Sequence, residues 1–156
     1  GPGAWAAVGV AFGAGCILGD LFLLRIRPRH ALRTAGIALL LASSQAAVYG
    51  SGAALAGLCA LQFIAGIGVT TFFTLWEVTL QEHIPGDSLS RVSSFDYLAS
   101  TILMPIGTAV VGPIATAVGT HRTLLGMRTV GIACAVAFLA VPEVRSLPRG
   151  AGAEEP

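Results

Sequence analysis

The chain has 156 residues, of which 54% are hydrophobic and 11% are charged, and its formal net charge is +1 at pH 7. Soluble domains usually carry about 25% charged residues. This composition therefore excludes an ordinary soluble domain, whose surface needs more charge, and the net charge indicates nothing about partners.

Long stretches without Asp, Glu, Lys or Arg divide the chain: residues 1–19, 34–76, 97–120 and 129–142. Charge-free apolar stretches of about 18 residues or more are typical of helices that span a bilayer. We therefore predict an all-α membrane protein with five transmembrane helices, over residues 3–24, 33–49, 53–76, 95–118 and 123–141. Residues 143–156 are polar and predicted to form a disordered cytoplasmic tail.

The first predicted span contains two pairs of glycines at GxxxG spacing, Gly9 with Gly13 and Gly15 with Gly19. Small residues one turn apart allow two helix backbones to approach closely in lipid. The pattern favours close packing against a neighbouring helix. The alternative is that glycine is simply frequent in membrane helices.

A basic turn follows the first span and contains Arg25, Arg27, Arg29 and Arg33. Pro28 prevents helix continuation there. Short arginine-rich loops stay in the cytoplasm, so we predict a cytoplasmic turn that contacts lipid headgroups rather than nucleic acid. A carboxylate within a membrane span marks a functional site unless it is paired, and Asp20 is expected to pair with Arg25 or Arg27.

Residues 34–76 are too long for one span, and the sequence at 49–52 predicts a break between two helices. Gln45 and Gln62 are polar residues at depth that either hydrogen-bond a neighbouring helix or face a polar cavity. Glu77 follows Trp76 near the end of the third span. It is a candidate gate or proton-linked carboxylate, or alternatively a solvated charge at a helix end.

Residues 81–94 are predicted to form a cytoplasmic connector with a turn at Pro85, followed by a short helix that Asp87 or Ser88 caps. Arg91 is expected to pair with Asp96 at the start of the fourth span. Arg91 and Asp96 are, with Glu77, the gating candidates.

The fourth span contains residues that bend a helix or allow close packing: Pro105, Gly107, Gly112 and Pro113. Two prolines exceed what a membrane anchor needs. The span is therefore predicted to be a bent, close-packing helix, and together with the connector it forms a hinge.

The predicted topology places seven arginines inside and two outside. Those inside are Arg25, Arg27, Arg29, Arg33, Arg91, Arg145 and Arg149, and those outside are Arg122 and Arg128. Arg128, within the fifth span, is expected to extend its side chain to the interface. This bias supports the orientation and leaves the amino terminus outside, so we expect at least one earlier span to precede this sequence.

Cys16, Cys59 and Cys134 occur singly in apolar segments, without the spacing of metal ligands or of a disulfide framework. The sequence contains neither HExxH nor GxSxG, and no clustered His or carboxylates at depth. We therefore expect neither an enzyme nor a bound cofactor or metal.

The order of a Gly-rich span, the RIRPRH turn, two spans, a PGDSLSRV connector and a span interrupted by Gly and Pro resembles the carboxy-terminal half of a major facilitator superfamily transporter. Residues 74–115 are similar to the bacterial branch that includes enterobactin exporters. The resemblance covers residues 1–142. It implies most of one six-helix bundle of a multi-pass transporter in the bacterial plasma membrane, which exports drugs or siderophores by alternating access.

The resemblance also implies residue roles. The family's cytoplasmic loop motif falls on Gly19, Leu21, Arg25, Arg27 and Arg29, with Leu23 where the motif has an aspartate. The Gly-Pro motif of antiporters is echoed by Gly107, Gly112 and Pro113.

The implied partners are the bilayer, an amino-terminal helical bundle that this sequence lacks, and a small-molecule substrate that the residues do not specify. We expect this chain not to transport by itself. The alternative is a membrane scaffold that does not transport.

Overall fold

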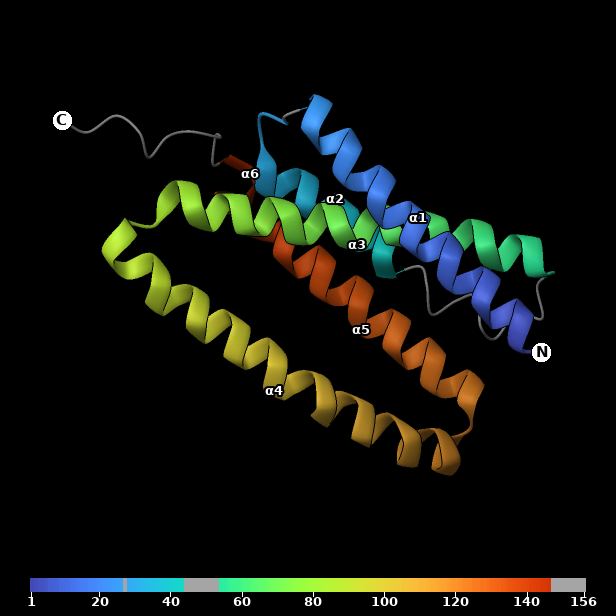
Figure 1. Cartoon of the computed structure of the whole chain (residues 1–156). Helices are drawn as coiled ribbons and strands as arrows, with labels where there is room; N and C mark the ends of the chain where they lie inside the picture. The colour runs from blue at the N-terminus through green and yellow to red at the C-terminus, as the bar shows by residue number, and fades with distance from the viewer. Residues whose placement is uncertain (27, 44–53, 147–156) are drawn as a thin grey trace.

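The structure is a computed structural model that describes residues 1–26, 28–43 and 54–146 (Figure 1). All regular elements in these ranges are helices: α1 Pro2–Ile26, α2 Ala31–Ser43, α3 Leu55–His83, α4 Gly86–Val118, α5 Thr120–Ala140 and α6 Pro142–Ser146. The predicted all-α class is confirmed.

Four helices, α1, α3, α4 and α5, are long and apolar enough to cross a bilayer. They indicate a multi-pass membrane protein. The remaining predicted span corresponds in part to α2, which has 13 residues. The rest of that span, including Gln45, lies outside the described residues, as does the predicted tail from residue 147 onward.

The structure differs from the sequence prediction at the connector. α3 continues to His83 and α4 begins at Gly86, so only Ile84 and Pro85 separate the two helices. Both have extended backbone angles, and the Pro85 carbonyl accepts hydrogen bonds from the N–H groups of Ser88 and Leu89. Neither Asp87 nor Ser88 caps the helix through its side chain. The polar residues after Pro85 instead form the first turns of a helix 33 residues long, about 50 Å.

α4 runs without interruption through Pro105 and Pro113. Each proline lacks the N–H that would bond the carbonyl four residues earlier, so the helix is weakened there. Threonine hydroxyls bond to neighbouring carbonyls. Thr108 Oγ1 donates to the Pro105 oxygen at 2.9 Å, and Thr116 Oγ1 donates to the Pro113 oxygen at 2.8 Å. The predicted weak points are thus present in a continuous helix.

The contact between α1 and α3 is made backbone to backbone. A Cβ atom added at Gly15 would overlap the Phe63 carbonyl oxygen, and one added at Gly66 would overlap the Phe12 carbonyl oxygen. Gly19 meets α3 one turn further along. Close packing is therefore confirmed for the Gly15 and Gly19 pair. It does not extend to Gly9 and Gly13, where an added Cβ would have no described atom within 4 Å.

α2 packs between α3 and α5. A Cβ at Gly68 of α3 would lie 2.6 Å from the Ala38 carbonyl oxygen, and Gly36 of α2 lies against the Leu139 side chain of α5. The core at this junction consists of Ala31, Ala35 and Leu75, which are nearly inaccessible. Small residues on α2 therefore allow it to contact both neighbours.

Aromatic rings join α3 to α5. Phe72 lies edge-on to Phe138 with ring centroids 6.0 Å apart, and Trp76 lies 6.4 Å from both rings. Such pairs stabilise by about 0.5–1.5 kcal/mol beyond the area they bury. The rings hold α5 beside α3 near the end where α3 meets α4.

Candidate functional site

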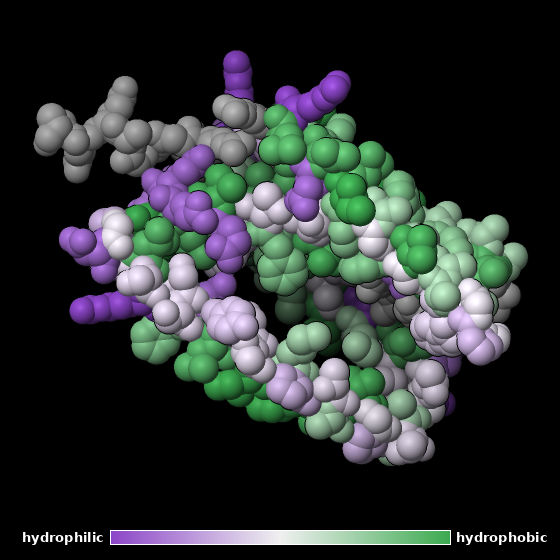
Figure 2. All heavy atoms as spheres, in the orientation of Figure 1, coloured by the Kyte–Doolittle hydropathy of each residue, from purple (hydrophilic) through white to green (hydrophobic). Residues whose placement is uncertain are grey.

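Charged side chains gather at one end of the molecule, where α1 and α3 end and α2 and α4 begin (Figure 2). The described charged residues at this end are Arg25, Arg29, Arg33, Glu82, Asp87, Arg91 and Glu143. The opposite end, where α4 meets α5, carries Arg122. The loops that the sequence assigns to one side of the membrane therefore lie at the same end of the fold.

Helix α4 stands apart from the rest of the molecule along most of its length (Figure 1). It contains no buried residue, and its half-buried positions lie near its ends, as at Asp96 and Val111. Every residue from 97 to 110 is exposed. Figure 2 shows a hollow between α4 and the other helices.

The membrane portion of α4 has a polar half and an apolar half. Successive residues of an α-helix are rotated by about 100° around its axis. On this basis the polar side chains between residues 95 and 110 all lie within about 140° of the circumference of α4. These residues, the polar half of α4, are Asp96, Tyr97, Ser100, Thr101 and Thr108, and Met104 is the large apolar side chain within the same arc. The opposite side, the apolar half, presents Phe95, Leu98, Ile102, Ile106 and Val110.

The polar half of α4 is turned toward the hollow. The half-buried residues Ser93, Asp96, Val111 and Ala115 mark the direction of the other helices, and this direction passes through the middle of the polar half. A polar face is unfavourable against lipid, particularly where it includes a carboxylate. The arrangement therefore suits a polar cleft or a contact with another polar surface.

Sequence reasoning missed the polar half of α4, although the signal was available. Ser100, Thr101 and Thr108 lie in a stretch without charge, so its average hydropathy conceals them. Their spacing follows the period of a helix.

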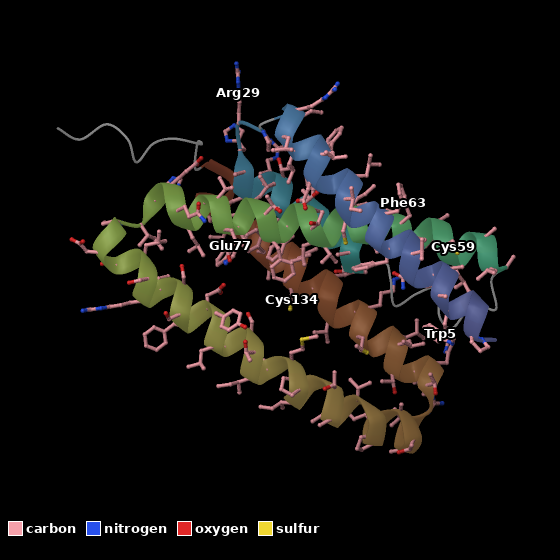
Figure 3. All side chains as sticks on the ribbon, in the orientation of Figure 1. Trp5, Arg29, Cys59, Phe63, Glu77 and Cys134 are labelled. Atoms are coloured by element: carbon pink, nitrogen blue, oxygen red, sulfur yellow. The ribbon has the colours of Figure 1, made fainter. Side chains whose placement is uncertain are left out.

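The gating candidates do not form one cluster. Glu77 is exposed on α3 (Figure 3). Arg91 and Asp96 are five residues apart, which places their side chains about 140° apart around α4. Among the described residues no ion pair joins either one to the other or to Glu77. Their roles in gating stay predictions.

The residues assigned to the loop motif separate into two groups. Gly19 is buried against Thr70 and Ile67 of α3, so it serves the helix contact. Arg25 and Arg29 are exposed at the charged end, and Arg29 extends away from the helices (Figure 3). Arg27 lies outside the described residues.

The helix-bend residues all lie on exposed surface of α4. A Cβ added at Gly107 or Gly112 would have no described atom within 4 Å. These glycines therefore pack against nothing in the described part of the chain. Close packing at Gly112 stays a prediction about a contact with another helix.

Asp20 accepts a hydrogen bond from Thr74 Oγ1 of α3 at 2.9 Å. The sequence predicted Arg25 or Arg27 as its partner, but the described structure has no ion pair between Asp20 and Arg25. The close approach at neighbouring Gly19 brings α3 within reach of this carboxylate. The carboxylate thereby joins the two helices near the charged end.

Replacing Thr74 with valine should destabilise the contact between α1 and α3 by about 1 kcal/mol, because the Asp20 carboxylate loses a donor. The matched control is Thr74→Ser, which keeps the hydroxyl and should retain most of that stability. The measurement is the loss of helical circular dichroism during titration with sodium dodecyl sulfate. Equal losses in both variants would show that the hydrogen bond contributes nothing.

Gln62 is buried on α3, with 7% of its surface exposed, and its Oε1 atom has no hydrogen-bond partner among the described residues. Gln45, the other polar residue predicted at depth, is not among them.

The three cysteines are free. No group of three or more His, Cys, Asp or Glu side chains within the described ranges is placed to hold a metal ion.

Comparison of the chain with known protein families, curated proteins and solved structures finds no match. The fold and the polar half of α4 are therefore the basis for assigning a function.

Proposed function

We propose that this chain is part of a transporter that exports small molecules by alternating access, as the resemblance to the major facilitator superfamily implies. The observation that supports the proposal most is the polar half of α4. Between residues 95 and 110, a helix of membrane-spanning length carries its polar side chains on the side that faces a hollow, and most of its large aliphatic side chains away from it. An anchor helix needs no such division.

In the proposed mechanism, two helical bundles rock about a central site, and this chain supplies most of one bundle. The polar half of α4 lines the path of the substrate. Pro105 and Pro113 let α4 bend as the path opens and closes, because each removes one backbone hydrogen bond. The second bundle is the amino-terminal one that the resemblance implies.

The charged end is proposed to face the cytoplasm of a bacterial cell, because arginine-rich loops are retained there. The proposed substrates are drugs or siderophores.

The tight contact between α1 and α3 makes these helices a rigid unit. α4 has few contacts and is therefore the element of the chain that moves most easily relative to this unit.

The test is export from bacteria that lack their own drug and siderophore exporters and produce the natural gene product containing this sequence. We expect lower accumulation of at least one fluorescent drug or siderophore. Ser100→Trp should abolish the effect by filling the path, whereas Ile102→Trp, on the apolar half, should leave it intact. Absence of export despite correct membrane insertion would overturn the proposal, and a non-transporting scaffold would give that result.

A further inference from the structure

A second recess lies on the surface formed by α1, α2 and α3. It is a groove of about 180 Å³, and its lining is almost wholly apolar. The residues that line it are Phe22, Leu23, Ile26, Pro28, Thr34, Ile37, Ala38, Leu41, Ile67, Gly68 and Thr71. A cavity of about 150 Å³ holds a benzene molecule, so this groove has room for a segment of a hydrocarbon chain.

The groove is bordered by exposed apolar side chains. Phe22, Ile26, Ile37 and Leu41 line it and are also exposed large apolar side chains. They belong to α1 and α2, on either side of the groove. Such a border favours contact with hydrocarbon over contact with water.

Three exposed arginines lie next in the chain to lining residues at the charged end of the groove. The lining residues Ile26, Pro28 and Thr34 are immediate chain neighbours of Arg25, Arg29 and Arg33, respectively. All three arginines are exposed. In the part of the chain that the structure describes, none of them forms an ion pair with a carboxylate.

Among the described residues, none of the acidic side chains near this end, Asp20, Glu82, Asp87 and Glu143, forms an ion pair with these arginines. Asp20 is bonded to Thr74. Glu143 belongs to α6, which follows α5, and α5 contacts α2 at Gly36 and Ser43. With about 100° of rotation per residue, the side of α2 that carries Gly36 and Ser43 lies roughly opposite the side that lines the groove.

We propose that this groove binds an anionic phospholipid, with an acyl chain along the apolar lining and the headgroup phosphate against the arginines. Guanidinium groups bind phosphate oxygens through paired hydrogen bonds. Basic pockets between membrane helices are suited to anionic headgroups. The site is separate from the polar half of α4, so the proposal does not depend on transport.

The test is native mass spectrometry of the full chain, released from detergent micelles that contain equal amounts of phosphatidylglycerol and phosphatidylcholine with identical acyl chains. We expect phosphatidylglycerol to be retained in at least about tenfold preference. The triple variant Arg25→Gln, Arg29→Gln, Arg33→Gln should lose that preference. The double variant Arg122→Gln, Arg128→Gln, which removes charge elsewhere, should keep it.

A second pair of variants tests the groove itself. Thr34→Trp fills the mouth and should reduce retention of phosphatidylglycerol at least about fivefold with all arginines present, whereas Ile102→Trp on α4 should not. Inorganic phosphate at millimolar concentration should fail to displace the lipid. Equal retention of both lipids would overturn the proposal. Unchanged retention in Thr34→Trp, or displacement by phosphate, would overturn it as well.

Discussion

Replacing Gly15 with leucine is expected to destabilise the folded helices by about 3 kcal/mol or more. The added Cβ overlaps the Phe63 carbonyl oxygen, and a backbone atom cannot rotate away as a side chain can. The helices must therefore separate. Membrane helices associate largely through van der Waals packing, so separation removes much of what holds α1 against α3.

The matched control is Gly9→Leu, in the same helix, where an added Cβ meets no described atom within 4 Å. It should leave stability within about 0.5 kcal/mol of the unchanged protein. The measurement is the same detergent titration, followed by helical circular dichroism. Similar losses in both variants would contradict the close contact between α1 and α3, because both substitutions alter the intrinsic helix propensity equally.

Gly112→Leu in the assembled transporter is expected to reduce export about tenfold or more while leaving the stability of this chain unchanged. Stability should not change because Gly112 is exposed and has no described neighbour. Export should fall because Gly112 lies one turn beyond Thr108, beside the polar half of α4, where the proposed second bundle packs. Overpacking costs about 1–3 kcal/mol, and a cost of about 1.4 kcal/mol in one conformation is enough to shift the balance between two states tenfold.

The control for this prediction is Gly126→Leu on α5, which is also exposed and without a described neighbour. It should affect neither export nor stability. Initial efflux rates and detergent stability are measured on the same preparations. Export at the unchanged rate in Gly112→Leu would mean that no helix packs closely at this position.

Much of the fold follows from local sequence, since charge-free stretches locate the long helices and Pro28 locates the first turn. The connector differs from its prediction because polar residues do not by themselves indicate a loop, and here they form the first turns of α4. Leu89 and Arg91 are compatible with a helix, and α4 simply extends beyond the thickness of a bilayer. Between α3 and α4, only Ile84 and Pro85 interrupt the helical backbone.

The contacts of the site depend on which helices become neighbours, and a single sequence does not contain that information. GxxxG spacing occurs at both glycine pairs of α1, but among the described residues only the pair Gly15 and Gly19 contacts another helix. Asp20 binds Thr74, which is 54 residues away in the chain. The rings of Phe72 and Phe138 likewise meet only because α5 lies beside α3.

The water accessibility of α4 in a bilayer tests most directly whether its polar half faces a cleft. Cys16, Cys59 and Cys134 are first replaced with serine, and single cysteines are then placed along residues 97–110. A water-soluble thiol reagent is applied to the reconstituted protein. Cysteines at Ser100 and Thr108 should react rapidly, and those at Ile102 and Ile106 slowly, because hydrocarbon excludes the reagent. Equal reactivity on both halves, or faster reaction on the apolar half, would contradict a polar cleft beside α4.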